Sequence, residues 1–385
     1  MNFELSEEQT MLKDTVDRLV SKSYSFQQRQ AYAGEADGWS RAMWAQYAEL
    51  GLLALPFDPE HGGLGYGPVE MMLVMESMGR ALVLEPFFST VVVAGAALRA
   101  AASPAQLAEW VPHIASGELL LAFAHTERQS RYNLADVACT ATPDGDAYRL
   151  DGEKVLVLHG EHADKLIVSA RLRSQRTERY GICLFMVDAN AAGVSRHAYR
   201  TQDGLRAADI SFDGVRVGAA DMIGEPGNGV TTIERVADYA IAALSAEAVG
   251  AMAATQEMTV DYLKTRSQFG SVIGSFQGLQ HRAAEMLVAL EQARSMAMYA
   301  ALMVTEYDLA ERRKALSAVK VQIGKSARFI GQQAIQLHGG IGVTEEYAVG
   351  HYFRRLSMME SQFGDTDHHL AKLAAAGGLI AAVDN

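Results

Sequence analysis

The apolar residues change their spacing twice along this 385-residue chain, and this change most limits the possible folds. Up to about residue 118 they recur every three or four positions, as on one face of a helix. Between about 119 and 225 they fall in short segments rich in β-branched residues, and no helical pattern separates these segments. From 226 onward the helical spacing returns. Because a doubly wound sheet needs helices between its strands, the order α, β, α instead predicts an α+β fold.

The first segment, 1–118, is expected to be an α-helical domain. Ser6 and Gln9 stand three apart before an apolar run, which is the spacing of a capping box. Further helices are predicted at 39–53, 69–84, 90–101 and 104–115. The run from Pro56 to Pro68 is dense in glycine and proline, so we expect a loop there.

The second segment, 119–225, is expected to be an antiparallel β domain. Strands are predicted at 148–150, 155–158, 165–170, 182–187 and 210–217. The pairs Asp144-Gly145 and Asp151-Gly152 are typical of hairpin turns. Four arginines at 171, 173, 176 and 179 are predicted to lie on a solvated turn.

The third segment, 226–385, is expected to form a four-helix bundle. Long helical patterns cover 230–266, 276–307 and 312–337, and shorter ones cover 347–359 and 368–375. Neighbouring histidines point apart on a helix, so His368 and His369 indicate a solvated face, and no metal site is expected. Asp365 or Thr366 would suit a helix N-cap.

Composition and charge exclude several classes of protein. With 34 basic and 46 acidic residues, the net charge of −12 argues against binding nucleic acid or an anionic membrane. The two cysteines, Cys139 and Cys183, are too few for a disulfide framework and favour a reducing compartment. The apolar run from Pro86 to Leu98 is shorter than the ~18–20 residues of a membrane span. Since the N-terminus also lacks a basic leader, a cytoplasmic location is expected.

Two motifs in the third segment have the chemistry of a nucleotide site. Residues 266–280 read RSQFGSVIGSFQGLQ, and residues 336–342 read QLHGGIG. An arginine such as Arg266 can grip a phosphate with two parallel hydrogen bonds. Gly339 and Gly340 permit close approach of the backbone to a ligand. From spacing alone, a helix cap and simple chain turns explain these residues equally well.

With these two motifs and the α–β–α order, nearly the whole chain resembles the acyl-CoA dehydrogenase family. The resemblance implies a three-domain enzyme that assembles into oligomers and holds FAD between subunits. The residues that match FAD-contacting positions are Arg266, Gln268, Phe269, Ile273, Phe276 and Gln277. Those that match the segment reaching a neighbouring subunit's FAD are Gln336, Gly339 and Gly340.

The resemblance also implies a reaction and partners. Family members remove a proton and a hydride from an acyl-CoA thioester, which forms an α–β double bond as in fatty acid β-oxidation. Electrons then pass to an electron-transfer flavoprotein. Asp238 and Thr126 match positions that contact the substrate. Within the family the sequence resembles small subunits of enzymes for dicarboxylyl-CoA thioesters such as pimeloyl-CoA.

The sequence departs from the family at the catalytic base, which is a glutamate at one of two positions. Phe363 occupies the first position and Ala240 the second, and neither can accept a proton. In a shifted register Glu360, Asp365 or Asp238 would be a weak candidate. The same region of the family contacts the FAD adenosine, which is a second possible role for Asp365.

The middle domain departs as well. The usual TEPGxGSD loop appears as Thr126-Glu-Arg-Gln-Ser-Arg131, where Arg128 and Arg131 could meet an anionic group. Leu156-Val-Leu158 replaces the usual Trp-x-Thr at the flavin ring. These departures leave three interpretations: a dehydrogenase subunit, a non-catalytic subunit that contributes to FAD binding in a mixed oligomer with a sister subunit, or a flavin oxidase that uses oxygen.

Overall fold

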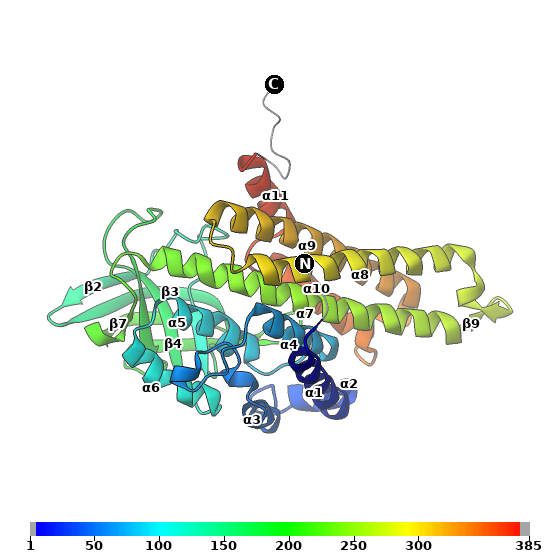
Figure 1. Cartoon of the computed structure of the whole chain (residues 1–385), viewed down its shortest axis with the longest axis horizontal. Helices are drawn as coiled ribbons and strands as arrows, with labels where there is room; N and C mark the ends of the chain where they lie inside the picture. Colours follow the sequence, from blue (N-terminus) through cyan, green and yellow to red (C-terminus); the bar gives the residue numbers. More distant parts are fainter. Residues whose placement is uncertain (1–4, 378–385) are drawn as a thin grey trace. The chain divides into compact units, whose positions relative to one another are not determined.

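The computed structural model describes residues 5–377. The expectation about a leader concerns the N-terminus, whose first four residues lie outside the described range. Contacts divide the chain into two compact units. Among the described residues, the helical unit comprises 5–31, 67–83 and 241–377, and the sheet unit comprises 32–66 and 84–240. Figure 1 locates the elements of both along the chain. The three-segment boundaries expected from the sequence stay a prediction.

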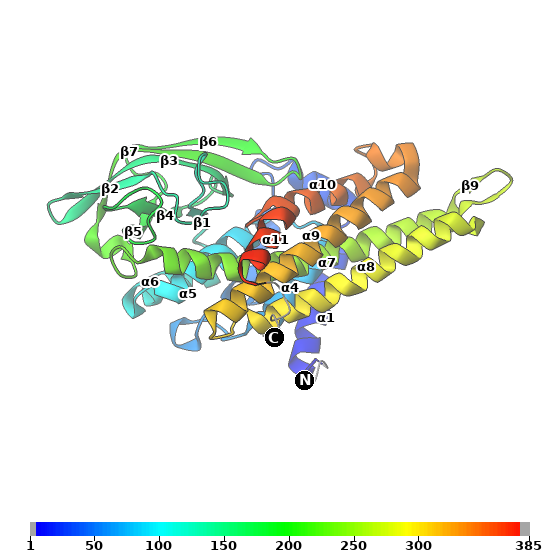
Figure 2. The ribbon, with the colours of Figure 1, turned by 90° about the horizontal axis from the view of Figure 1, so that it is seen from above.

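The helical unit is built from long helices that pack side by side. Its elements include α1 (Glu7–Ser23), α4 (Pro68–Ala81), the larger part of α7 (Gly229–Thr265), α8 (Gln277–Met303), α9 (Leu309–His338), α10 (Ala348–Ser361) and α11 (Thr366–Ala375). α2 (Phe26–Ala33) begins in this unit. Both views show α8 lying along α9 (Figure 2). A short hairpin of β9 (Ser267–Gln268), β10 (Ser271–Val272) and the turn η5 (Ile273–Ser275) joins α7 to α8.

Local signals explain where these helices begin. The Ser6 hydroxyl accepts the Gln9 backbone N–H at 3.1 Å, and the Gln9 side chain accepts the Ser6 N–H at 3.0 Å, which confirms the capping box. Asp308 caps α9, and Asp365 caps α11 by accepting the His368 N–H at 2.8 Å. The N-cap expected at Asp365 is therefore confirmed.

α4 and α7 approach each other closely through two glycines. A Cβ atom at Gly79 would lie 2.0 Å from the Glu247 carbonyl oxygen, and one at Gly250 would lie 1.9 Å from that of Glu76. Backbone atoms cannot move aside as a flexible side chain can, so only glycine permits this contact.

The sheet unit is a mixed sheet with helices. Its strands are β1 (Leu121–Ala124), β2 (Thr140–Asp144), β3 (Ala147–Leu158), β4 (Lys165–Arg171), β5 (Ile182–Asp188), β6 (Val194–Arg200), β7 (Arg206–Gly218) and β8 (Met222–Ile223). The order is β6-β7-β3-β2-β4-β5-β8, and β1 pairs with β4. Most pairs are antiparallel as expected, but β1–β4 and β2–β4 are parallel. The helical elements are α3 (Arg41–Glu49), the π-helical segment η3 (Phe88–Ala94), α5 (Gly95–Ala101), α6 (Pro104–Ala115), the short turns η1 (Leu52–Ala54), η2 (Pro59–His61) and η4 (Ala219–Asp221), and the first turns of α7.

The two expected hairpin turns have different outcomes. Asp144 and Gly145 do turn the chain between β2 and β3, and Gly145 has a φ of +66°. The turn predicted at Asp151-Gly152 is wrong, because β3 runs through both residues as one long strand. The register to β7 shifts there instead, so Gly152 marks a bulge rather than a turn.

The arginine-rich stretch is not simply a solvated turn. Arg171 is buried, and its guanidinium donates to the Val137 carbonyl at 3.0 Å and the Ala135 carbonyl at 2.7 Å. Arg179 makes two hydrogen bonds to the Glu234 carboxylate, at 2.7 and 2.8 Å. Arg176 pairs with the Asp136 carboxylate at 2.8 Å. Tertiary packing therefore engages three of the four arginines around the loop after β4.

α7 is long and apolar enough to cross a membrane by length and composition alone. However, 89% of its most apolar window is buried inside the protein. Such burial is typical of a core helix.

Candidate functional site

The first nucleotide motif lies in the hairpin between α7 and α8. Arg266 is exposed, and the Phe269 ring is 92% exposed with its backbone at a φ of +55°. Phe269 and Phe276 pack edge to face with centroids 6.3 Å apart. The hairpin thus presents a cation and two aromatic rings to the outside of the helical unit, as a ligand or partner surface requires. Gln268 and Gln277 are exposed beside them, and Ile273 is half-buried.

The second motif lies where α9 ends. Gln336, Gly339 and Gly340 are exposed, and no atom lies within 4 Å of a Cβ built on either glycine. Buried His338 stacks on Tyr262 near the end of α7, with centroids 4.6 Å apart. This stack places both motifs at the same end of the helical unit.

In the sheet unit, a buried ion pair holds the altered Thr126–Arg131 loop. The Lys154 ammonium lies 2.6 Å from the Glu127 carboxylate, and the two residues are 0% and 4% exposed. Glu127 also accepts the N–H groups of Ala138 at 2.7 Å and Cys139 at 3.1 Å. Burial opposes ionisation of Glu127, but Lys154, the Gln129 amide and the Ala138 N–H hold the pKa of Glu127 below its usual value. These contacts therefore hold the backbone of the loop in place. Thr126 remains exposed at its start.

The exposed side of this loop is a small charged surface. Arg128 pairs with Asp209 at 2.8 Å and with Glu153 at 3.2 Å, and these hydrogen bonds raise its pKa. Asp209 also accepts the backbone N–H of Leu156 at 3.1 Å and the Tyr199 hydroxyl at 2.7 Å. Arg128 is thus engaged by carboxylates of its own chain.

The segment at the first base position is held by buried polar groups. Phe363 has a φ of +56°, and its carbonyl oxygen lies 3.0 Å from Nε2 of buried His369. Burial lowers the pKa of His369 to about 3, so its ring is neutral. The solvated face predicted for His368 and His369 is therefore wrong for His369, because the ring packs against the loop that precedes its own helix.

The other base candidates are also accounted for. Ala240 is 0% exposed, and Asp238 is 7% exposed in the sheet unit. Glu360 accepts from Arg328 at 3.0 Å and from the Thr366 backbone N–H at 3.2 Å, while Asp365 caps α11. Both weak candidates in this segment are thus occupied in shaping the turn between α10 and α11.

Lys320 fastens the same turn from α9. Its buried ammonium donates to the carbonyl oxygens of Met359 at 2.9 Å and Glu360 at 3.2 Å. Burial lowers the pKa of Lys320 to about 8, although Glu360 and Asp365 oppose the shift.

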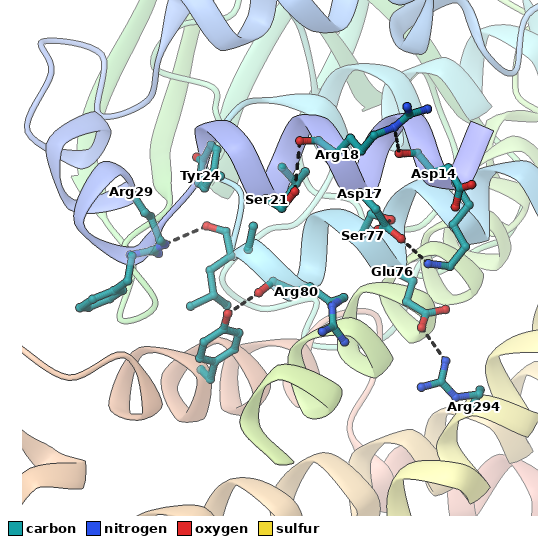
Figure 3. Close-up of a pocket in the computed structure, with 16 residues that line it drawn as sticks. Asp14, Asp17, Arg18, Ser21, Tyr24, Arg29, Glu76, Ser77, Arg80 and Arg294 are labelled. Carbon is teal, nitrogen blue, oxygen red and sulfur yellow. Dashed lines mark hydrogen bonds and ion pairs between the residues drawn. The ribbon is translucent and has the colours of Figure 1, made fainter. Parts of the chain in front are cut away.

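A cleft of about 880 Å³ opens in the helical unit between α1, α4 and α10 (Figure 3). Its polar side chains largely bond to one another: Ser77 donates to Asp17 at 2.5 Å, and Arg294 lies 2.6 Å from Glu76. None of the residues that the sequence predicts for cofactor or substrate lines it. In the described part of the chain, no group of three or more His, Cys, Asp and Glu is arranged to hold a metal ion.

Comparison with known proteins identifies the family. Residues 6–118, 122–215 and 227–378 match the N-terminal, middle and C-terminal domains of acyl-CoA dehydrogenases. The acyl-CoA dehydrogenase FadE12 of Mycobacterium tuberculosis is 30% identical over 80% of each chain. The chain belongs to the acyl-CoA dehydrogenase family. The probable acyl-CoA dehydrogenase YngJ of Bacillus subtilis is 28% identical over 99% of this chain and all of its own. The ChsE4-ChsE5 complex of Mycobacterium tuberculosis has the same fold, with a TM-score of 0.87, 23% identity and coverage of 99% and 100%.

Acyl-CoA dehydrogenases are oxidoreductases that bind FAD, and FAD is the cofactor of this chain. The hairpin after α7 and the end of α9 have the chemistry needed to bind the nucleotide part of FAD. The hairpin offers exposed Arg266 and Phe269, and the open backbone at Gly339 and Gly340 leaves room for a ligand to approach.

Sequence reasoning missed the buried polar groups that fasten these segments. One signal for the Glu127–Lys154 pair was present in the sequence: both residues lie in the part of the chain that matches the middle domain of the family. Their pairing across 27 positions needed the folded sheet. The buried ion pair between Glu247 and Arg355, at 2.7 Å, likewise needed the folded helices, because these residues lie 108 positions apart.

Proposed function

We propose that this acyl-CoA dehydrogenase is a FAD-binding subunit of an oligomer that forms an α–β double bond in an acyl-CoA thioester. We further propose that a sister subunit supplies the proton acceptor. The mixed oligomer is then the active form, and this chain alone is inactive or nearly so.

The observation that carries the proposal is the state of the two base positions. Phe363 and Ala240 cannot accept a proton, and the carboxylates of Glu360 and Asp365 are engaged in hydrogen bonds. A general base must lie within hydrogen-bond reach of the substrate proton and be available to take it. The ChsE4-ChsE5 complex supports the proposal, because it has this fold and is a complex of two named proteins.

The residues of this chain would bind and orient. Arg266, Gln268, Phe269, Ile273, Phe276 and Gln277 would hold one FAD, and Gln336, Gly339 and Gly340 would reach the FAD of a neighbouring subunit. When bound, FAD supplies the hydride acceptor. Asp238 would contact the pantetheine arm, and Thr126 would contact the substrate from the fastened loop. The Glu127–Lys154 pair would keep that loop in one position.

Three finer points belong to the same proposal. The substrate is a dicarboxylyl-CoA such as pimeloyl-CoA, the electron acceptor is an electron-transfer flavoprotein, and the location is cytoplasmic. The sequence similarity to small subunits supports the first. The net charge of −12 and the presence of only two cysteines are consistent with the last.

The test installs the missing base. Phe363→Glu in the chain purified alone should give measurable dehydrogenation of acyl-CoA with an artificial electron acceptor, because the carboxylate returns to a family position. Phe363→Gln is the matched control, since it has the same size but cannot act as base. Flavin content per chain is measured in both variants.

Two outcomes would count against the proposal. Full activity of the unaltered chain alone would show that another group serves as base. An absence of flavin and of acyl-CoA binding, both alone and after co-expression with the sister subunit, would contradict any role in this reaction. Production of peroxide by the unaltered chain would instead favour a flavin oxidase.

A further inference from the structure

Two arginines lie against one tyrosine ring in the sheet unit, close to the start of α7. The guanidinium carbon of Arg99, on the last turn of α5, lies 4.6 Å from the centroid of the Tyr239 ring. That of Arg235, one turn before Tyr239 on α7, lies 4.9 Å from the same centroid. Figures 1 and 2 both show α5 beside the first turns of α7.

Arg99 is the unusual member of this cluster. Its Nε atom is shielded from solvent and has no hydrogen-bond partner among the described residues. Burial lowers the pKa of Arg99, Tyr239 opposes the shift, and Arg235 adds to it. A shielded donor without an acceptor costs free energy, and two cations that share one ring repel each other. An apolar side chain in place of Arg99 would avoid both costs.

A bound oxyanion would reduce the energetic costs of the buried Arg99 donor and of the two neighbouring cations. A phosphate or carboxylate near Nε of Arg99 would accept the free N–H and offset the positive charge of Arg99, and arginine is the side chain best shaped for such groups. The Tyr239 ring would hold both guanidinium groups in place through cation–π contacts. Tyr239 lies in the same turn of α7 as Asp238, the residue that the proposed function places against the pantetheine arm.

We propose that Arg99 and Arg235, held on the Tyr239 ring, form an oxyanion-binding subsite for the acyl-CoA ligand. The anion is a phosphate of the CoA moiety or the terminal carboxylate of a dicarboxylyl chain. This subsite rests on the proposed function, because it needs an acyl-CoA bound along α7.

The experiment compares three ligands by calorimetry on the flavin-loaded protein, co-expressed with its sister subunit where that is needed. Heptanoyl-CoA carries the phosphates, pimeloyl-pantetheine carries only the terminal carboxylate, and heptanoyl-pantetheine carries neither. Arg99→Met should weaken one of the first two by roughly ten- to a hundredfold, as expected for a lost charge-assisted hydrogen bond, and leave heptanoyl-pantetheine unchanged. The ligand that loses affinity identifies the anion.

Arg216→Met is the matched control. Arg216 lies in the same unit, is exposed and pairs with Asp146 at 2.9 Å, so its loss removes one positive charge elsewhere. Equal weakening of heptanoyl-CoA by both variants would reduce the effect to net charge and would overturn the subsite.

Thermal unfolding with inorganic phosphate separates a ligand role from a structural one. Phosphate should raise the Tm of the unaltered protein more than that of Arg99→Met, and without phosphate the variant should be at least as stable. A variant that is less stable and equally sensitive to phosphate would overturn the subsite. Unchanged affinity for all three ligands would overturn the subsite alone. An unaltered protein that binds none of them would overturn the proposed function with it.

Discussion

At the scale of the residue, the buried Glu127–Lys154 pair is the clearest case of a side chain whose role depends on its partner. Lys154 lies 2.6 Å from the Glu127 carboxylate and 2.9 Å from the Ser169 hydroxyl. Because desolvating two charges is costly, such a pair adds little stability compared with an apolar core. Removing one partner is nevertheless destabilising, because the other charge then stays buried without compensation. The pair thus places the Thr126 loop rather than simply strengthening the sheet.

We therefore expect Lys154→Met to lower the free energy of unfolding by about 3–5 kcal/mol, because the Glu127 carboxylate stays buried without its cation. The double variant Lys154→Met with Glu127→Gln should recover part of this loss, since no buried charge remains and the amide oxygen can still accept one of the two backbone N–H groups of Ala138 and Cys139. Urea unfolding measures both.

Arg128→Met is the control for this pair. Arg128 is exposed and paired with Asp209 and Glu153, so its loss should leave the free energy of unfolding nearly unchanged. If Lys154→Met costs as little as the control, the buried pair does not hold the loop.

At the scale of the element, the sequence predicted most helices but not how they meet. The expected helices at 104–115 and 230–266 correspond to α6 and α7 within one residue at each end. Periodicity and caps are local, so they can be recognised without knowing the fold. The glycine contact between α4 and α7 could not be predicted from periodicity or caps, because a glycine can occur within a helix for many reasons.

Gly250→Ala should separate α4 from α7 and lower the free energy of unfolding by about 1–3 kcal/mol. The new Cβ atom would lie 1.9 Å from the Glu76 carbonyl oxygen and 2.9 Å from the Arg80 nitrogen, so backbone must shift. Thermal unfolding followed by circular dichroism would report the loss.

Gly278→Ala is the matched control, since Gly278 lies in α8 with no atom within 4 Å of its added Cβ. There the substitution should be neutral or stabilising by up to about 1 kcal/mol. Equal effects at the two glycines would mean that helix propensity, and not the close approach, governs Gly250.

At the scale of the whole molecule, each unit contains a buried neutral histidine. Burial lowers the pKa of His125 in the sheet unit to about 3, and Lys154 adds to the shift. Burial likewise lowers the pKa of His369 in the helical unit to about 3. Both rings would need to take a proton as the protein unfolds in acid.

Stability should accordingly fall with pH below about 6.5, the ordinary pKa of histidine. Between that value and about 3, the unfolded chain binds protons that the folded chain does not, so each histidine costs about 1.4 kcal/mol per pH unit. Urea unfolding at pH 7, 6 and 5 measures the slope. His369→Asn should make it shallower, and a slope that both His125→Asn and His369→Asn leave unchanged would contradict this account.

The sequence alone determined the order of elements, the loops rich in glycine and proline, and the two motifs that carry the resemblance to acyl-CoA dehydrogenases, because each depends on residues close together along the chain. It also revealed that Phe363 and Ala240 replace the usual base. The folded structure was needed to show that Glu127 contacts Lys154, that Glu247 contacts Arg355, and that Arg99 lies on the Tyr239 ring. Such pairs join residues 27 to 140 positions apart, and the packing of helices and strands, rather than any local pattern, brings them together.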